Sequence, residues 1–170
     1  MTSASLRRVD PTRQADPLRR AYVAFLGTRA GRWTAINIAP KIDPWLLNVS
    51  RGRLGMALML PSTLITTTGA KSAQPRTNAV LYFHDGADVI VIASSYGRDS
   101  HPAWYYNLKA NPRVTIGAGQ QMTATEVIDE SERARLWASA DRVYPLFADY
   151  RVRAATLGRV IPIIRLNENV

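Results

Sequence analysis

The sequence predicts a domain of the α+β class in which six mainly antiparallel strands form a small, closed or partly open β-barrel. From Leu64 onward, segments rich in β-branched and apolar residues alternate with turn residues, and few helical segments intervene. Closing such hairpins into a barrel protects their outer strands from unwanted pairing. The chain has 170 residues, 46% of them hydrophobic, which suffices for a sizeable core.

The first 60 residues are expected to form a basic, amphipathic helical extension, and residues 61–170 to form the barrel domain. Residues 1–53 contain ten Lys or Arg and three Asp residues, a net charge of +7 out of +9 for the whole chain. The basic character therefore belongs to the extension and says little about the barrel.

Two helices are predicted within this extension. The first begins at Asp16-Pro17, an N-cap followed by proline at the first helical position, and glycines at positions 27 and 31 are expected to end it. The second begins at Asp43-Pro44. The apolar residues of the two helices are Leu18, Tyr22, Phe25, Leu26, Trp45, Leu46 and Val49.

These amphipathic helices have two interpretations. Either they pack on the barrel domain through their apolar faces, or residues 16–53 attach to an anionic membrane surface through apolar burial and positive charge. Both interpretations remain open at this point.

The strands are predicted from β-branched and apolar runs bounded by turns. Asp85-Gly86 suits the tight turn of a hairpin, and the continuously apolar run Val89–Ala93 is typical of a strand covered on both faces. Pro162, within the last strand, indicates an edge position or a bulge. The six predicted strands are Leu64–Thr68, Arg76–His84, Asp88–Ala93, Arg113–Ala118, Gln121–Ile128 and Val160–Leu166.

Two helices are predicted between these strands. The first spans His101–Ala110 and ends at Asn111-Pro112, after a polar loop over residues 94–100. The second is capped by Asp129 or Ser131 and continues to Tyr144-Pro145.

Composition excludes several kinds of chemistry. Without cysteine there are no disulfides or thiolate ligands, and His84 and His101 are too few and too scattered to predict a metal site. The N-terminus lacks the apolar core of a signal peptide, and the longest apolar run of the chain, Met56–Pro61, is too short to span a bilayer. A cytoplasmic protein is therefore expected. Nucleic-acid binding is not expected, because the arginines lack interleaved aromatic residues.

The turn between the first two strands has the composition of an anion site. Residues 69–75 include Gly, Lys, Ser and Gln, and Arg76 begins the next strand. Small residues let backbone N–H groups converge, and two cations flank that point, which suits a phosphate or another oxyanion. The alternative is an ordinary hairpin with solvated charges.

Several stretches together resemble the deazaflavin-dependent nitroreductase family of actinobacteria. They follow the order found in that family and cover roughly residues 60–166. The resemblance implies a split β-barrel that binds coenzyme F420, a deazaflavin with a phosphodiester and an oligoglutamate tail. Family members transfer a hydride from its reduced form to quinones, nitroaromatics or activated enones. The matching stretches are Leu64–Arg76, Ala93-Ser94, His101–Pro112, Tyr144–Tyr150 and Ile161–Ile163.

The resemblance also implies which residues hold the coenzyme. Ala70, Lys71 and Ser72 would meet the phosphate. The other residues of the set would line the deazaflavin and its linker, with Trp104 as one wall. An anionic tail needs cations and free N–H groups, which Lys71, Arg76 and the turn could supply. The complete set is Ala70, Lys71, Ser72, Arg76, Thr77, Asn78, Ala79, Val80, Ile92, Ala93, Ser94, Ser95, Ala103, Trp104, Tyr105, Tyr106 and Asn107.

Three hydroxyls are candidates for hydrogen-bonding the electron acceptor. Aromatic residues at positions 144, 147 and 150 cover the substrate in the family. Because Phe147 has no hydroxyl, the catalytic candidates are Tyr144, Tyr150 and Ser94, while solvent could equally supply the proton. Without the resemblance, an aromatic trio at this spacing indicates a packed helix face.

The leading hypothesis is therefore an F420H2-dependent oxidoreductase acting on an apolar acceptor such as a quinone, without a metal. It would be a cytoplasmic protein, and membrane attachment of residues 16–53, if it occurs, would place it peripherally at the inner face of the plasma membrane. Related barrels often form homodimers. One alternative is a non-catalytic lipid- or fatty-acid-binding member of the same fold, since family cations are replaced by Ala70 and Ser95. Another is a relative that binds flavin mononucleotide.

Overall fold

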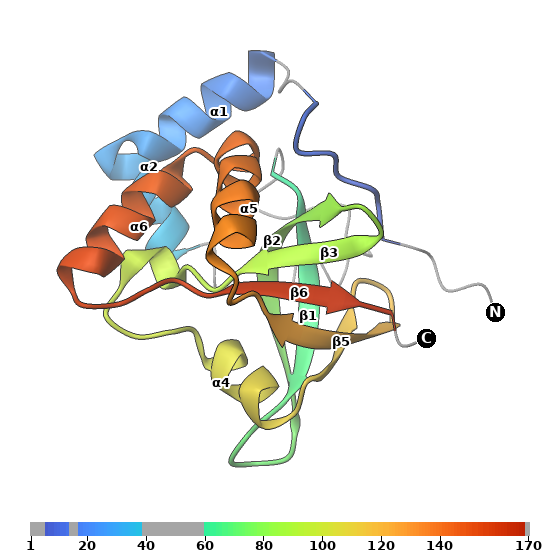
Figure 1. The fold of residues 1–170 in the computed structure, drawn as a ribbon. Helices are drawn as coiled ribbons and strands as arrows, with labels where there is room; N and C mark the ends of the chain where they lie inside the picture. The colour runs from blue at the N-terminus through green and yellow to red at the C-terminus, as the bar shows by residue number, and fades with distance from the viewer. Residues whose placement is uncertain (1–5, 14–16, 39–59, 169–170) are drawn as a thin grey trace.

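The structure is a computed structural model that describes residues 6–13, 17–38 and 60–168. Its helices are α1 (Pro17–Gly27), α2 (Arg29–Asn37), α4 (Ala103–Ala110), α5 (Glu130–Val143) and α6 (Leu146–Thr156), with a 3₁₀ helix, η1 (Ser95–Gly97). Its strands are β1 (Ser62–Thr68), β2 (Pro75–Asp85), β3 (Asp88–Ile92), β4 (Arg113–Ile116), β5 (Gln120–Glu126) and β6 (Ile163–Asn167). Helices α1, α2, α5 and α6 gather on one side of the barrel, and α4 lies at its lower end (Figure 1).

The six strands form a closed, wholly antiparallel barrel, which confirms the predicted fold class. Their order is β1-β2-β3-β6-β5-β4, and pairing between β1 and β4 closes the ring. Strands β1 and β2 pair in register from Ser62 opposite Leu81 to Thr68 opposite Pro75. The predicted turn thus joins the two halves of one long hairpin.

Strand β6 differs from its prediction. It lies between β3 and β5, so the edge position indicated by Pro162 is wrong. Pro162 precedes the strand and contributes only its carbonyl, which accepts a hydrogen bond of 3.0 Å from the N–H of Ala93. Because proline has no N–H to donate, the strand begins one residue later, at Ile163.

Apolar residues of the barrel form two buried clusters. Alternate strand residues such as Ile65, Val91 and Leu166 fill the interior together with Trp104 and Leu108 of α4. The second cluster joins the outer face of the strands to α1, α5 and α6. All residues from Val89 to Ala93 are buried, which confirms that this strand is covered on both faces.

The N-terminal helices correct one prediction. Gly27 ends α1 as expected, but Gly31 lies inside α2 because the Thr28 hydroxyl caps a new helix by accepting from the N–H of Gly31, at 3.1 Å. A Cβ at Gly31 would lie 2.2 Å from the carbonyl oxygen of Phe25, so glycine allows the two helices to meet closely. The second predicted helix, from Asp43-Pro44, lies outside the described residues.

Residues 6–9 lie along β2. The carbonyl of Val9 accepts from the N–H of His84 at 2.9 Å, and the N–H of Val9 donates to His84 Nδ1 at 3.0 Å. The Tyr82 hydroxyl donates to the carbonyl of Arg7 at 2.9 Å. This part of the extension therefore contacts the barrel, while the division at residues 60 and 61 stays a prediction.

Helix α5 begins as predicted from its cap. The Asp129 carboxylate accepts from the N–H of Glu132 at 2.8 Å. The hydrogen bond from the Ser131 hydroxyl, and then the one from Glu132, lower the pKa of Asp129. In the described part of the chain, no helix is long and apolar enough to cross a bilayer.

Candidate functional site

The turn between β1 and β2 is held by hydrogen bonds within its own backbone. The N–H of Gly69 donates to the carbonyl of Gln74 at 2.9 Å, and the N–H of Ala73 donates to the carbonyl of Gly69 at 2.8 Å. A Cβ at Gly69 would lie 2.6 Å from the Ser72 hydroxyl and 3.2 Å from the carbonyl oxygen of Gln74, so a side chain there would require the turn to shift. Ala73 adopts a positive φ of 54°.

Asn107 of α4 fixes the same turn from below. Its Oδ1 accepts from the N–H of Ala70, and its Nδ2 donates to the hydroxyl of Thr67, both at 3.0 Å. Asn107, which the resemblance predicts as a coenzyme contact, is buried, and both ends of its amide bond to the hairpin. The N–H groups of Lys71 and Ser72 have no acceptor among the described residues, so two adjacent donors remain at the tip of the turn.

The predicted residues around this turn divide by exposure. Ala70, Lys71, Ser72, Arg76 and Thr77 are exposed, Asn78 and Ala79 are half-buried, and Val80 is buried in the barrel interior. The Thr77 hydroxyl shares a hydrogen bond of 2.8 Å with Thr66 on β1. The two cations and the two N–H donors are thus accessible together, as binding of an oxyanion requires.

Helix α4 places its predicted residues in three environments. Trp104 is buried in the barrel interior, whereas Ala103 and Tyr106 are exposed. The Tyr105 hydroxyl donates to the Glu126 carboxylate at 3.0 Å. Burial, and then this hydrogen bond, raise the pKa of Tyr105 to about 12. Trp104 and Tyr105 are therefore engaged with the barrel itself.

The loop after β3 has an unusual backbone. Ser95 and Tyr96 adopt positive φ values of 48° and 56°, and Gly97 follows at 71°. Ile92 and Ala93 are buried, and Ser94 and Ser95 are half-buried. The Ser94 hydroxyl has no hydrogen bond with any described residue, so it is available to a ligand.

Sequence reasoning missed Arg159, which binds this loop. Its guanidinium donates to the carbonyls of Arg98 at 2.7 Å, Ala93 at 3.2 Å and Ser94 at 2.5 Å. One of its nitrogens also lies 3.0 Å from His101 Nδ1. No local pattern distinguishes Arg159 from the chain's many other arginines, because all its partners are distant in sequence.

The three aromatic residues at positions 144, 147 and 150 form one buried cluster. Ring centroids of Tyr144 and Phe147 lie 5.2 Å apart, and the hydroxyls of Tyr144 and Tyr150 lie 3.2 Å apart. Burial raises the pKa of Tyr144, as does its hydrogen-bonded neighbour Tyr150, so its hydroxyl stays protonated. The cluster continues to Tyr96 of η1, whose ring lies 6.1 Å from that of Tyr150.

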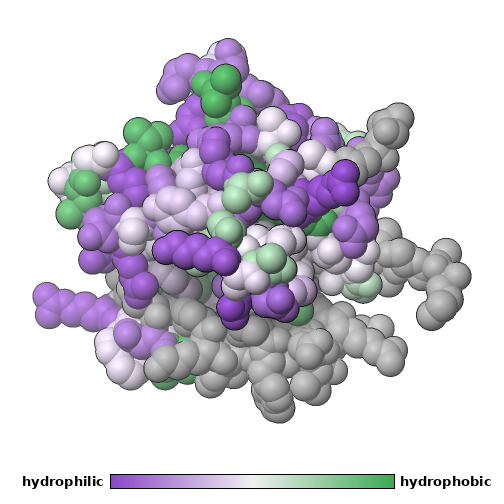
Figure 2. All heavy atoms as spheres, turned by 90° about the horizontal axis from the view of Figure 1, so that it is seen from below, coloured by the Kyte–Doolittle hydropathy of each residue, from purple (hydrophilic) through white to green (hydrophobic). Residues whose placement is uncertain are grey.

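Contacts connect these stretches along one side of the barrel. Asn107 links α4 to the turn, the contact between Arg159 and His101 links the start of α4 to the loop, and Tyr96 links the loop to α6. The turn and α4 lie at the lower end of the barrel (Figure 1). Seen from below, the described surface is mainly hydrophilic (Figure 2).

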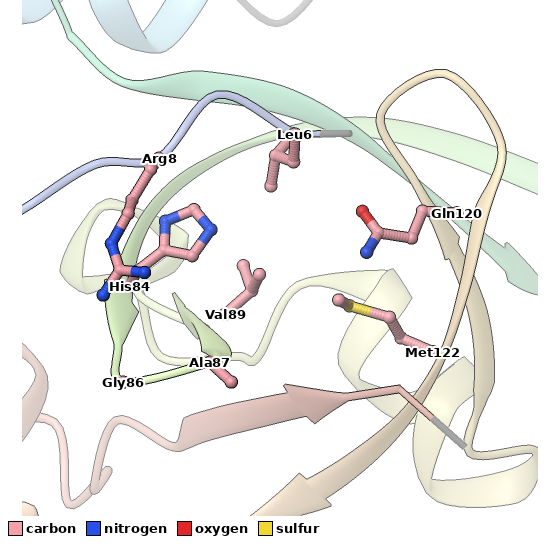
Figure 3. A pocket seen from close by; sticks show the side chains of 8 residues that line it. All are labelled: Leu6, Arg8, His84, Gly86, Ala87, Val89, Gln120 and Met122. Carbon is pink, nitrogen blue, oxygen red and sulfur yellow. The ribbon is translucent and has the colours of Figure 1, made fainter. Parts of the chain in front are cut away.

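A pocket of about 220 Å³ lies near the other end of β2, at the turn to β3. Its side chains surround a small space between residues 6–8 and the barrel (Figure 3). It contains none of the predicted site residues, and its lining residues are Leu6, Arg8, His84, Gly86, Ala87, Val89, Gln120 and Met122. Within the described ranges, no group of three or more His, Asp or Glu residues could hold a metal ion.

Comparisons with known proteins define the class first. The fold is similar to a solved F420H2-dependent reductase (FDR-A), with a TM-score of 0.55 and 35% identity over 63% of this chain and 94% of that one. A second solved structure, a domain-swapped dimer, matches with a TM-score of 0.56 and 29% identity over 74% of this chain and 96% of that chain.

Sequence comparison identifies the family. An F420H2-dependent quinone reductase of Mycobacterium tuberculosis is 38% identical over 128 residues, which cover 69% of this chain and 81% of the relative. The family model of F420H2-dependent quinone reductases matches residues 41–168, and the chain belongs to that family. The predicted family, the class of enzyme and the coenzyme are therefore confirmed.

Proposed function

We propose that this chain transfers a hydride from reduced coenzyme F420 to a quinone, and that nitroaromatics and activated enones are further acceptors. The main observation behind this proposal is the turn between β1 and β2. Two N–H donors there, which have no acceptor among the described residues, lie beside the exposed Lys71 and Arg76. This donor set fits the phosphodiester of the coenzyme, which is anionic and accepts several hydrogen bonds.

The remaining residues would orient the reactants. Bound F420H2 supplies a hydride, and reduction of a quinone to a quinol also requires one proton. The turn would hold the phosphodiester, and Ile92 to Ser95 would border the deazaflavin. Exposed Tyr106 and Ala103 would line the outer wall of the site.

Ser94 is the hydroxyl best suited to hydrogen-bond the acceptor or the deazaflavin edge. Ser94 is half-buried, and its hydroxyl has no hydrogen-bond partner among the described residues, whereas Tyr144 and Tyr150 are buried and bonded to each other. The tyrosine pair would then shape the apolar side of the acceptor site. Ser94→Ala should lower kcat for a menaquinone analogue by about tenfold, which matches the loss of one hydrogen bond. Tyr144→Phe should have a smaller effect.

Coenzyme binding is the direct test of this function. Titration with oxidised F420, followed by its fluorescence, should show saturable quenching. Lys71→Ala and Arg76→Ala should each weaken binding by roughly 10- to 100-fold, as expected for a charge-assisted hydrogen bond. Lys109→Ala is the matched control, because Lys109 is exposed but pairs with Glu126 at 3.1 Å. Absence of binding at tens of micromolar would refute the proposal, and native mass spectrometry would then search for a bound lipid or flavin mononucleotide.

The N-terminal helices would bring the enzyme to a lipid-soluble acceptor. Leu18, Phe25 and Trp33 are 65%, 49% and 60% exposed, and the basic residues Arg20 and Arg29 are exposed on the same helices. Large apolar side chains among cations suit an anionic bilayer. The rest of the proposed membrane segment, residues 16–53, lies partly outside the described residues.

Co-sedimentation with anionic liposomes tests this docking. Replacing Leu18, Phe25 and Trp33 together by serine should abolish binding. Replacing Val152 and Leu157, which are also exposed but belong to α6 and its end, should leave binding unchanged. Equal binding by both variants would contradict membrane docking through α1 and α2.

A homodimer is also proposed, because one similar solved structure is a domain-swapped dimer. Light scattering coupled to size-exclusion chromatography should give twice the mass of one 18.9 kDa chain. A monomeric mass at micromolar concentration would contradict it.

A further inference from the structure

Among the residues whose burial the structure describes, Arg159 is the only charged one that is buried. Its side chain lies in the segment between α6 and β6, with an exposed fraction of 6%. A buried cation is costly unless polar groups or an anion compensate it. The compensation here comes from three carbonyls and one imidazole nitrogen, all within residues 93–101.

No described carboxylate forms an ion pair with Arg159. Burial lowers the pKa of Arg159, and more distant Tyr106 and Asp99 only partly oppose this shift. An arginine remains protonated in proteins, so the site keeps a positive charge. Carbonyl dipoles stabilise that charge without cancelling it, and an anion bound nearby would gain from it.

The loop that Arg159 holds has the backbone of an anion-binding concavity. Ser94 is right-handed, with φ −66° and ψ −38°, and Ser95 is left-handed, with φ 48°. Successive residues of opposite hand turn neighbouring N–H groups toward one point. The first of these groups, the N–H of Ser94, already donates to the carbonyl of Ile92 at 2.9 Å. The N–H of Ser95 has no acceptor among the described residues. Two consecutive non-glycine residues at positive φ are also strained, and they persist only where other contacts impose them.

We propose that Arg159 is a positioning residue that imposes this loop conformation and makes residues 93–98 a binding element for an anionic group. The inference rests on the proposed function, and the anion is the phosphodiester or a carboxylate of the coenzyme tail. The buried charge of Arg159 then takes the place of a surface cation, since positions 70 and 95 are Ala and Ser.

Hydrogen exchange without coenzyme tests the positioning role. Arg159→Met should raise amide exchange in residues 93–101 by about tenfold or more, because the loop carbonyls lose their donor. Arg159→Lys keeps the charge but not the fork of donors, and it should show an intermediate increase. Arg151→Met is the control: Arg151 also belongs to the C-terminal part of the chain, but it pairs with Asp141 and stacks on Trp137. It should leave exchange in residues 93–101 unchanged.

Binding of three deazaflavins tests the anion. The probes are intact F420, a derivative truncated after the phosphodiester, and the deazaflavin nucleoside without phosphate. Arg159→Met should weaken intact F420 by about tenfold or more and the nucleoside by less than about twofold. Weakening of the truncated derivative to the same degree as F420 identifies the phosphodiester, and weakening of F420 alone identifies a carboxylate of the tail.

The outcomes separate the two proposals. If the unmodified protein binds none of the probes, the proposed function is wrong, and exchange still tests the role of Arg159 in the loop. If the protein binds F420 but Arg159→Met changes neither exchange nor affinity, the inference about Arg159 is wrong. An equal loss of affinity for all three probes would overturn the proposal that residues 93–98 bind an anionic group. Should the Met variant not fold, the Lys variant carries the same comparison.

Discussion

Two irregular segments of the candidate site are each held by one buried polar side chain from elsewhere in the chain. The turn after β1 is held by Asn107, a neutral amide with two hydrogen bonds to the hairpin. The loop after β3 is held by Arg159, a charged group with four polar contacts. The turn is exposed at its tip, whereas the loop packs against α6.

The difference shows that the segment with the more strained backbone is held by more hydrogen bonds from a distant side chain. The turn has one non-glycine residue at positive φ, Ala73, and its own backbone hydrogen bonds support it. The loop has two such residues in succession, and the buried carbonyl of Ala93, which follows the last paired residue of β3, accepts from Arg159 at 3.2 Å. Because each unsatisfied buried group costs about 1–3 kcal/mol, the loop requires the larger anchor. We therefore expect changes in the loop to be more damaging than changes in the turn.

The largest effect is expected from Gly97→Ala in the loop. A Cβ there would lie 2.9 Å from the carbonyl oxygen of Tyr150, and φ is +71°. Strain and the clash with the backbone of α6 should together destabilise the fold by roughly 3 kcal/mol. Gly86→Ala is the control, since φ is +64° and no atom lies within 4 Å; it should cost about 1 kcal/mol. Urea unfolding of both variants measures the difference, and equal losses would show that α6 does not confine the loop.

A smaller effect is expected from Asn107→Ala. Two hydrogen bonds disappear and the buried Thr67 hydroxyl loses a partner, so the free energy of unfolding should fall by about 2 kcal/mol. F420 affinity should fall as well, because the N–H donors of the turn are no longer fixed. Asn111→Ala, at the end of α4, removes the side-chain oxygen that accepts from the N–H of Arg113 at 3.2 Å. It should lower the free energy of unfolding by about 0.5 kcal/mol. A stable Asn107→Ala variant with unchanged affinity would contradict this role.

Acidification should lower the free energy of unfolding, through His101 beside the loop, by less than about 1 kcal/mol. Burial lowers the pKa of His101 below its usual 6.5, and the charge of Arg159 lowers it further, against a smaller opposite effect of Glu126. The unfolded chain therefore binds more protons between the lowered pKa and pH 6.5, and stability is lost as pH falls through that range.

Thermal melts between pH 5 and 7 measure this effect. His101→Gln keeps an acceptor for Arg159 and should flatten part of the dependence. His84, whose pKa burial also lowers, contributes to the remainder, so a His84→Gln variant is measured beside it. An unchanged profile in His101→Gln would rule out His101 as the source.

The smallest effect on stability is expected from Lys71→Ala. Lys71 is exposed and has no hydrogen bond to any described residue, so the free energy of unfolding should change by less than about 0.5 kcal/mol. Loss of F420 affinity without loss of stability would separate the binding role of the turn from its folding role. A large destabilisation would instead show that Lys71 belongs to the support of the turn.

Local pattern was sufficient for most of the fold. The six strands, the Asp129 cap and the helix before Asn111-Pro112 depend on neighbouring residues, and the structure confirms them. Gly31 was predicted to end a helix because glycine usually does, but its close contact with Phe25 is a tertiary reason for the same residue. The family was also recognisable, because its matching stretches are continuous in sequence.

What the sequence by itself determined was therefore the barrel, its turns and the family of F420H2-dependent quinone reductases. Only the tertiary structure decided which polar groups remain available for a ligand. Asn107 reaches Ala70 across 37 positions, and Arg159 reaches Ala93 across 66. Whether a polar side chain is available to a ligand depends on hydrogen-bond partners that are distant in sequence, and no local sequence pattern predicts those partners. For this reason the tyrosine pair and Asn107 are engaged internally, while the side chains of Ser94 and Lys71 and the N–H groups at the tip of the turn have no hydrogen-bond partner among the described residues.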